Sequence, residues 1–180
     1  MNVTTPLATV TIRVDPGSIL TANRRLHWTQ RSARTKTVRT TAGFEARAQR
    51  MPRGLGRARV VARVDYPDRR ARDAHNLMPT LKAAVDGLID AGLLPDDNDA
   101  YLDGPDPRAT GKVTPGVFTI HLDIYGPDVP EESLRAAVTN WLRVGIAAGA
   151  GPEDLRRFMD WVASGATGPP PTPGKEQRNE

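Results

Sequence analysis

The chain has 180 residues, of which 38% are hydrophobic and 26% charged, with a formal net charge of +4. This length and apolar content suffice for one core of ordinary size, with room for an appendage. The absence of cysteine excludes disulfides, thiolate metal sites and a cysteine nucleophile. No basic stretch followed by an apolar run opens the chain, and no apolar segment approaches the roughly 18 residues of a membrane span. We therefore expect a soluble, cytoplasmic protein that makes no membrane contact.

Charge is distributed unevenly along the chain. Residues 13–72 hold sixteen Lys or Arg against four acids, whereas residues 73–127 hold nine Asp against three cations. Fifteen of the sixteen early cations are arginine, whose guanidinium can form paired hydrogen bonds with phosphate oxygens. A basic half beside an acidic cluster suits a metal-dependent nuclease, because one surface binds the polyanion while carboxylates hold the cation. Charged residues on solvated faces would give the same composition, so the imbalance alone does not decide between the two.

Hydrophobic periodicity predicts both strands and helices, which indicates the α+β class; that the strands form a small mixed β-sheet packed with helices is implied only by the family resemblance described below. In chain order we expect a strand at 8–14, a loop and an arginine-rich polar helix within 22–49, a strand at 57–66, a helix at 77–91, a short strand, and a strand at 113–125. Pro79 suits the first turn of the helix at 77–91, and Gly92 suits the position after its end. The last two strands are expected to pair antiparallel through a turn near Gly111.

The composition changes beyond Pro127. Residues 131–148 and 152–164 carry apolar residues at helical intervals, which predicts a helical hairpin. The remaining residues are rich in Gly and Pro, and we expect them to be disordered. The predicted domains are therefore a first domain at 1–127, a hairpin appendage at 128–164 and a disordered tail at 165–180. The hairpin serves either as extra packing or dimer contact, or as an interaction module that recruits a partner through Trp141, Phe158 or Trp161.

Three short segments, at residues 68–76, 81–88 and 94–99, carry side chains suited to phosphodiester hydrolysis. This reaction needs a divalent cation to polarise the phosphate and activate water, and a few carboxylates suffice to hold Mg²⁺. A nearby cationic side chain can stabilise the charge that develops on the phosphate. The residues that supply these groups are Asp73, Asp96, Asp97 and Lys82. Each segment taken alone is also typical of a turn or of a surface helix.

The order and spacing of the three segments together resemble the RusA family of Holliday-junction resolvases. The matching runs are Asp-Arg-Arg-Ala-Arg-Asp-x-x-Asn at 68–76, Lys-x-x-x-Asp-Gly-Leu at 82–88 and Gly-Leu-Leu-Pro-Asp-Asp at 92–97. Upstream, Ala-Asn-Arg-Arg-Leu-His-Trp at 22–28 is similar to the Asn- and Arg-containing loop that these proteins carry after their first strand. The resemblance covers residues 8–126. It implies a small mixed α/β fold, a homodimer, and Mg²⁺-dependent paired nicking of four-way DNA junctions in recombination, repair or phage DNA processing.

The resemblance assigns roles position by position. Asp73 matches the first catalytic aspartate and Asp97 the last, and Lys82 matches the functional lysine if residues 79–81 are an insertion. The expected metal ligands are Asp73, His75, Asp96 and Asp97, with Mg²⁺ as the ion and Mn²⁺ as the alternative. His75 departs from the family, which has aspartate there; a neutral imidazole can still ligate a metal. Alternatively, His75 caps or packs beside the helix, or marks a chain that binds branched DNA without cleaving it.

Arginines are expected to contact phosphates rather than bases, since no base-reading motif is present. The candidates are Arg24, Arg25, Arg31, Arg34, Arg69, Arg70 and Arg72. Trp28 is predicted to lie in the core, with stacking on an opened base as the alternative.

Geometry raises one further question. A helix at 79–91 is about 20 Å long, so Asp73 enters near one end and Asp97 leaves near the other. Residues 93–97 extend over at most about 17 Å, so a return of Asp97 to the same site is possible but tight. Either the segment at 73–78 runs back along the helix, or two subunits build each site.

Overall fold

The computed structural model describes residues 5–126, 131–147, 149–163 and 171–172, without the side chains of residues 131–137 and 163. The chain divides into two compact units, Met1–Gly126 and Pro127–Glu180. The predicted disorder of residues 165–180 falls almost entirely outside the described residues, and it stays a prediction.

The fold is mixed α+β with a C-terminal helix pair, as the periodicity predicts. In the first unit the elements are β1 (Ala8–Val14), the short 3-10 helix η1 (Pro16–Ser18), α1 (Trp28–Ala48), β2 (Ala58–Tyr66), the 3-10 helix η2 (Ala74–Leu77), α2 (Met78–Asp90), β3 (Leu102–Val113) and β4 (Phe118–Tyr125). The second unit contains α3 (Glu131–Ala147) and α4 (Pro152–Ala163). None of the described helices is both long and apolar enough to cross a bilayer.

The four strands form one sheet in the order β1-β4-β2-β3. β4 pairs antiparallel with both β1 and β2, whereas β3 pairs parallel with β2. The expected antiparallel pairing of the last two strands is therefore wrong. Gly111 lies inside β3 rather than in a turn. β4 takes the interior position because Phe118, Ile120, Leu122 and Ile124 are all buried, while the polar β3 occupies the edge.

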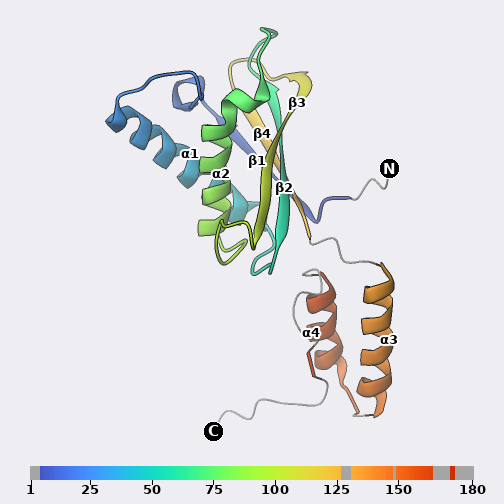
Figure 1. The fold of residues 1–180 in the computed structure, drawn as a ribbon. Helices are drawn as coiled ribbons and strands as arrows, with labels where there is room; N and C mark the ends of the chain where they lie inside the picture. The colour runs from blue at the N-terminus through green and yellow to red at the C-terminus, as the bar shows by residue number, and fades with distance from the viewer. Residues whose placement is uncertain (1–4, 127–130, 148, 164–170, 173–180) are drawn as a thin grey trace. The chain divides into compact units, whose positions relative to one another are not determined.

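The core lies between the sheet and the two helices α1 and α2, which cover the same face (Figure 1). Alternation along β1 directs Val10, Ile12 and Val14 to this face. From α2, Leu81 and Leu88 are completely buried. The apolar faces of the strands and of the two helices thus pack together in one layer.

α1 and α2 approach each other closely at Gly87. A Cβ atom at this position would lie 2.3 Å from the Arg39 carbonyl oxygen and 2.9 Å from the Ala42 Cβ atom. Beside this crossing, the Arg39 guanidinium makes a paired ion contact with the Asp90 carboxylate, at 2.5 and 2.7 Å. The Asp90 contact raises the pKa of Arg39, which remains charged at any physiological pH. Glycine is therefore required at position 87 by helix packing.

The free edge of β1 is occupied by the side-chain amide of Gln49, which follows α1. The backbone N–H of Thr11 donates to Gln49 Oε1 at 2.8 Å, and Gln49 Nε2 donates to the Thr11 carbonyl oxygen at 2.7 Å. Gln49 Nε2 also donates to the Glu45 carboxylate at 2.8 Å, which fixes the amide orientation. One side chain thereby pairs both backbone groups of Thr11.

The sheet face opposite α1 and α2 carries a polar network on β1, β2 and β4. The Arg63 guanidinium binds the Asp123 carboxylate, which also accepts from Thr9 Oγ1 at 2.7 Å. Burial on its own would raise the pKa of Asp123, but the bonds from Arg63 and Thr9 outweigh it and leave the pKa lowered. Asp123 is only 3% exposed, so this ion pair is a structural element of the sheet.

The second unit has an aromatic core of its own. The rings of Trp141 and Phe158 stack with centroids 4.3 Å apart and planes inclined by 16°. The Trp141 indole donates to the carbonyl oxygen of Pro171 at 2.8 Å. Trp141 and Phe158 are buried within this unit, so these two rings pack the helix pair and do not form an exposed docking patch.

Candidate functional site

The first candidate carboxylate, Asp73, stands at the start of a continuous helical segment. Its side chain accepts a hydrogen bond from the backbone N–H of His75 at 2.9 Å and so caps η2, which leads directly into α2. The upstream loop joins the same place, because Asn23 Nδ2 donates to Asn76 Oδ1 at 3.1 Å and the Ala22 N–H donates to the Asn76 carbonyl oxygen at 2.8 Å. The loop at 22–28 and the segment at 68–76 therefore meet in the structure.

The second candidate group pairs Lys82 with Asp97. Lys82 Nζ lies 2.8 Å from Asp97 Oδ2 and 3.7 Å from Asp86 Oδ1. The bond to Asp97 raises the pKa of Lys82, and the same bond lowers the pKa of Asp97. Lys82 lies near the start of α2 and Asp97 follows its end, so the chain after α2 runs back along the helix. Asp97 therefore returns to the start of α2, although it follows the end of this helix in the sequence.

Asp96 serves the turn after α2. Its carboxylate accepts from the Asp97 backbone N–H at 2.7 Å and from Asn98 Nδ2 at 2.9 Å. These short-range bonds are typical of an aspartate that fixes a turn. Asp96 thus holds the backbone that presents Asp97 to Lys82.

The predicted ligands do not assemble into one metal site. Within the described residues, no three His, Asp or Glu side chains are grouped so that they could hold a metal ion. Asp97 and Asp96 belong to the group around Lys82, whereas no hydrogen bond or ion pair links Asp73 to that group. The described conformation of a single chain therefore does not fit the expected Mg²⁺ ligand set of Asp73, His75, Asp96 and Asp97.

His75 is exposed, on the turn between Asp73 and α2. Its imidazole forms no hydrogen bond or ion pair with any residue in the described part of the chain, whereas its backbone N–H donates to Asp73 and its carbonyl oxygen accepts from the Met78 N–H. Packing into the core is thereby excluded as its role. Metal ligation by His75 stays a prediction.

The candidate arginines separate into two sets. Arg34 Nη1 donates to the Ile19 carbonyl oxygen at 3.1 Å, and Arg72 binds Asp68 through both nitrogens, so these two side chains serve the fold. The exposed set is Arg24, Arg25, Arg31, Arg69 and Arg70. Phosphate contact is compatible with this second set.

Trp28 does not lie in the core, so this expectation is wrong. Its side chain is 73% exposed and its ring neighbours that of His27, with centroids 5.9 Å apart. It is the first residue of α1, and the buried positions of that helix begin only at Val38. The helix reaches the core two to three turns after Trp28, which leaves the indole in solvent.

No protein-family model matches the chain, and no curated protein sequence matches it. The likeness to the RusA family accordingly rests on the segments at 22–28, 68–76, 82–88 and 92–97 alone.

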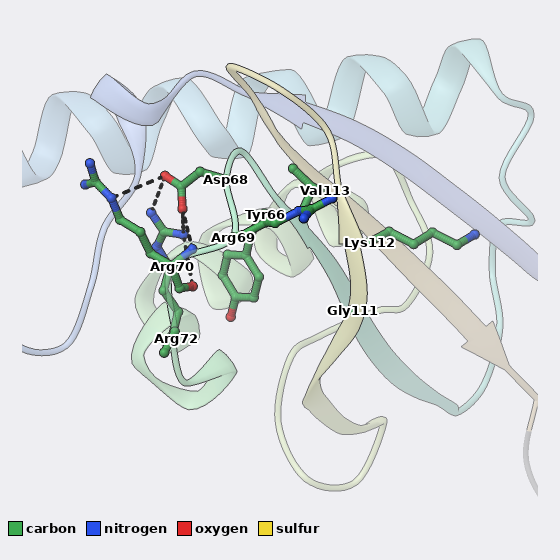
Figure 2. A pocket seen from close by; sticks show the side chains of 9 residues that line it. Tyr66, Asp68, Arg69, Arg70, Arg72, Gly111, Lys112 and Val113 are labelled. Atoms are coloured by element: carbon green, nitrogen blue, oxygen red, sulfur yellow. Dashed lines mark hydrogen bonds and ion pairs between the residues drawn. The ribbon is translucent and has the colours of Figure 1, made fainter.

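A pocket of about 640 Å³ lies between the arginine run after β2 and the end of β3. Its lining residues are Tyr66, Asp68, Arg69, Arg70, Ala71, Arg72, Gly111, Lys112 and Val113. Figure 2 shows the Tyr66 ring standing between the arginine run and β3. The sequence points to the arginines, but it gives no signal for Tyr66 or Lys112, because the parallel pairing of β2 with β3 alone brings them together.

The Asp68 carboxylate organises one wall of this pocket. It binds the Arg72 guanidinium at 2.5 and 2.8 Å and accepts from the Arg70 backbone N–H at 2.9 Å. These bonds, with that from Arg72 the largest, hold the pKa of Asp68 well below its usual range. The Arg72 guanidinium in turn lies over the rings of Tyr66 and Phe118, at 5.4 and 5.8 Å from their centroids.

Proposed function

We propose that the chain is a cytoplasmic, Mg²⁺-dependent endodeoxyribonuclease of the RusA type, which nicks four-way or otherwise branched DNA as a homodimer. The observation that carries the proposal is the 2.8 Å contact between Lys82 and Asp97. These residues come from two different segments of the resemblance, and a lysine held beside a carboxylate is suited to a phosphodiester substrate. The ammonium can stabilise negative charge on a phosphate, and its raised pKa keeps it protonated at neutral pH.

The separation of the carboxylates bears directly on the homodimer. Among the described residues no three His, Asp or Glu side chains are grouped to hold a metal ion, and a second copy of the chain is one way to complete a site that takes both Asp73 and Asp97. We expect that mixing an Asp73→Asn variant with an Asp97→Asn variant restores nicking if each site takes residues from two subunits. The absence of nicking in the mixture, with each variant still dimeric by light scattering, would contradict shared sites.

DNA binding is expected to depend on the exposed arginines. Arg24, Arg25 and Arg31 flank the start of α1, and Arg69 and Arg70 lie beside the pocket after β2. In a plot of the logarithm of the binding constant against the logarithm of the salt concentration, each neutralised phosphate makes the slope more negative by about 0.9. Anisotropy titrations of a labelled junction at several salt concentrations should therefore show a steep loss of affinity, and a flat response would rule out an electrostatic DNA interface.

The direct test is nicking of a labelled mobile four-way junction beside plain duplex, in Mg²⁺, Mn²⁺ or EDTA. We expect metal-dependent symmetric cutting of the junction by the wild type and none by Asp97→Asn. Asp99→Asn is the matched control. Asp99 is an exposed aspartate two residues after Asp97, it does not contact Lys82, and its replacement removes the same charge. Equal cutting by the wild type and Asp97→Asn would reject the proposed role of Asp97.

A second candidate function is a branched-DNA-binding protein without cleavage. The observation that favours it is the lack of a three-ligand metal group among the described residues, together with His75 in place of aspartate. Tight junction binding with no cutting in either metal would establish this function, and recovery of cutting by His75→Asp would then identify the position responsible. If His75 is instead a ligand, Mn²⁺ should support activity at least as well as Mg²⁺, and His75→Ala should remove that preference.

A further inference from the structure

The loop between α1 and β2 carries arginines that the fold does not use. Residues 46–64 contain six arginines and no acidic residue. Arg47 donates to carbonyl oxygens of α1 and α2, and Arg59 and Arg63 lie beside carboxylates of neighbouring strands. The other three side chains are exposed and form no hydrogen bond or ion pair with any described residue. These three are Arg50, Arg53 and Arg57.

The backbone of this loop, residues 50–57, is held in place. The Gly54 N–H donates to the Gly92 carbonyl oxygen at 2.8 Å, and the Leu55 N–H donates to the Leu93 carbonyl oxygen at 2.9 Å. The loop is thereby fastened to the chain that follows α2, at the same end of the first unit (Figure 1). The side chains of Met51 and Leu55 are buried, 5% and 3% exposed. The exposed arginines alternate with these anchors, so a ligand would meet a loop that is already ordered.

Arg50 occupies a position where the fold favours glycine. Its φ is +54°, and it is the only non-glycine residue with a positive φ in the described part of the chain. The Arg50 N–H donates to the Arg47 carbonyl oxygen at 3.2 Å, and the Met51 N–H donates to that of Ala46 at 2.9 Å. This pattern commonly ends a helix with a left-handed residue, which is usually glycine because a Cβ atom is strained there. The requirements of the helix end therefore do not explain an arginine at position 50.

The chemistry of the loop favours the phosphate backbone of a nucleic acid as its ligand. Unpaired guanidiniums with no acidic residue among them attract a polyanion, and their forks suit phosphate oxygens. The two large apolar residues of the loop are buried, so it exposes no apolar side chain for a membrane or for an apolar protein surface. The three arginine Cα atoms span at most about 25 Å, which corresponds to about seven successive phosphates of one strand at about 3.4 Å each.

We propose that the loop at 50–57 is a separate DNA-binding surface, which holds the phosphate backbone of duplex DNA through Arg50, Arg53 and Arg57. Ten residues of helix and turn separate Lys82 from Gly92, to which the loop is fastened, a distance of about 15 Å along α2 at about 1.5 Å per residue. The loop therefore lies away from the candidate reacting groups. That the duplex is an arm of a DNA junction rests on the proposed function, whereas the affinity for duplex DNA does not.

The test is binding of a labelled duplex of about 20 base pairs by the full chain, followed by anisotropy in EDTA at several salt concentrations. Arg50→Asn removes the charge and keeps a residue that tolerates a positive φ. Arg50→Gly removes the charge and the strain together. A triple variant combines Arg50→Asn with Arg53→Gln and Arg57→Gln. Arg156→Gln is the matched control, because it removes the same charge from a guanidinium that lies 3.5 Å from Glu153.

Each lost phosphate contact should weaken binding about fivefold at about 0.15 M salt and make the salt slope less negative by about 0.9. We expect this change for Arg50→Asn and Arg50→Gly, and a loss of more than about a hundredfold for the triple variant. Arg156→Gln should change the affinity by less than about twofold, since it removes no phosphate contact. The melting temperature of the free Arg50→Gly protein should be unchanged or raised by up to about 4 °C, because the left-handed strain is relieved.

Equal affinity of the wild type and the triple variant would overturn the proposal, and so would a wild type that does not bind duplex DNA. A lowered melting temperature of both Arg50→Gly and Arg50→Asn would show that the arginine serves the fold, which would also overturn it. The competing ligands are polyglutamate and vesicles of equal parts phosphatidylserine and phosphatidylcholine. Tighter loop-dependent binding of either one than of duplex DNA would reassign the loop to an acidic protein or a membrane.

The outcome is independent of cleavage. Because the binding measurements contain no divalent metal, an absence of nicking leaves them unaffected. Conversely, a protein that nicks junctions but binds duplex equally well with and without the three arginines would remove this proposal and leave the nuclease intact.

Discussion

Replacing Gly87 by alanine tests whether the glycine of the Lys-x-x-x-Asp-Gly-Leu segment serves helix packing or chemistry. The new Cβ atom would lie 2.3 Å from the Arg39 carbonyl oxygen, whereas ordinary contact begins at 3.4 Å. α1 and α2 would have to separate by about 1 Å, and overpacking of this kind typically costs about 1–3 kcal/mol. Alanine returns up to about 1 kcal/mol of helix propensity. Because the obstacle is backbone, we expect a net loss of about 2 kcal/mol in the free energy of unfolding.

Thermal melts followed by far-UV circular dichroism would measure this loss. A loss of about 2 kcal/mol lowers the melting temperature of a domain of this size by about 6–10 °C. Gly43→Ala, with its nearest contact at 3.1 Å, should lower it less. Gly145→Ala in α3 is the control, because its Cβ would meet neighbours only at 3.4 Å or more. A Gly87→Ala protein that melts with the wild type but no longer nicks DNA would refute the packing argument and assign the glycine to the reaction.

Three further outcomes follow from the structure. The lowered pKa of Asp123 means that its pairing with Arg63 stabilises the fold above its ordinary pKa of 3.8 and is lost as the pH falls below it; urea midpoints of the wild type should therefore drop between pH 5 and 3 more steeply than those of Asp123→Asn. Trp28→Ala should change the free energy of unfolding by less than about 0.5 kcal/mol, because the indole is 73% exposed. A larger loss of stability in a thermal melt would contradict the exposed position of Trp28. A chain ended at Gly126 should keep the melting transition of the first unit, since that unit is compact by itself; aggregation of the truncated chain in sedimentation would contradict this.

Regular periodicity made most of the fold predictable. β1 matches its predicted range, and α2 begins and ends within one residue of the expected positions, because Pro79 and Gly92 mark its ends. β3 could not be placed, since it carries Gly104, Pro105 and Pro107 and no alternating apolar residues. Its position follows from the crossover through α2, which returns the chain parallel to β2. Strand neighbours in a sheet depend on such connections, which local composition does not record.

The candidate site was predictable as a set of residues but not as an arrangement. Lys82 and Asp97 come together because the chain after α2 folds back, which the sequence allows without requiring. Asp73 caps η2 at the start of the helical segment, and no hydrogen bond or ion pair among the described residues joins its side chain to Lys82 or Asp97. No sequence motif indicated Tyr66, because a tyrosine at the end of a strand is common. Only the structure shows that its buried hydroxyl has no hydrogen-bond partner.

The Gln49 amide on β1 limits how two copies of this chain can associate. An exposed strand edge is a template on which another chain can add a strand, and proteins avoid uncontrolled growth by blocking it. On one side of the sheet, Gln49 already takes both backbone groups of Thr11. On the other side, β3 presents Pro105, Pro107 and the charged Asp106–Arg108 pair. A continuous intermolecular sheet is therefore disfavoured at both margins, and the proposed homodimer would use helices, loops or the polar sheet face.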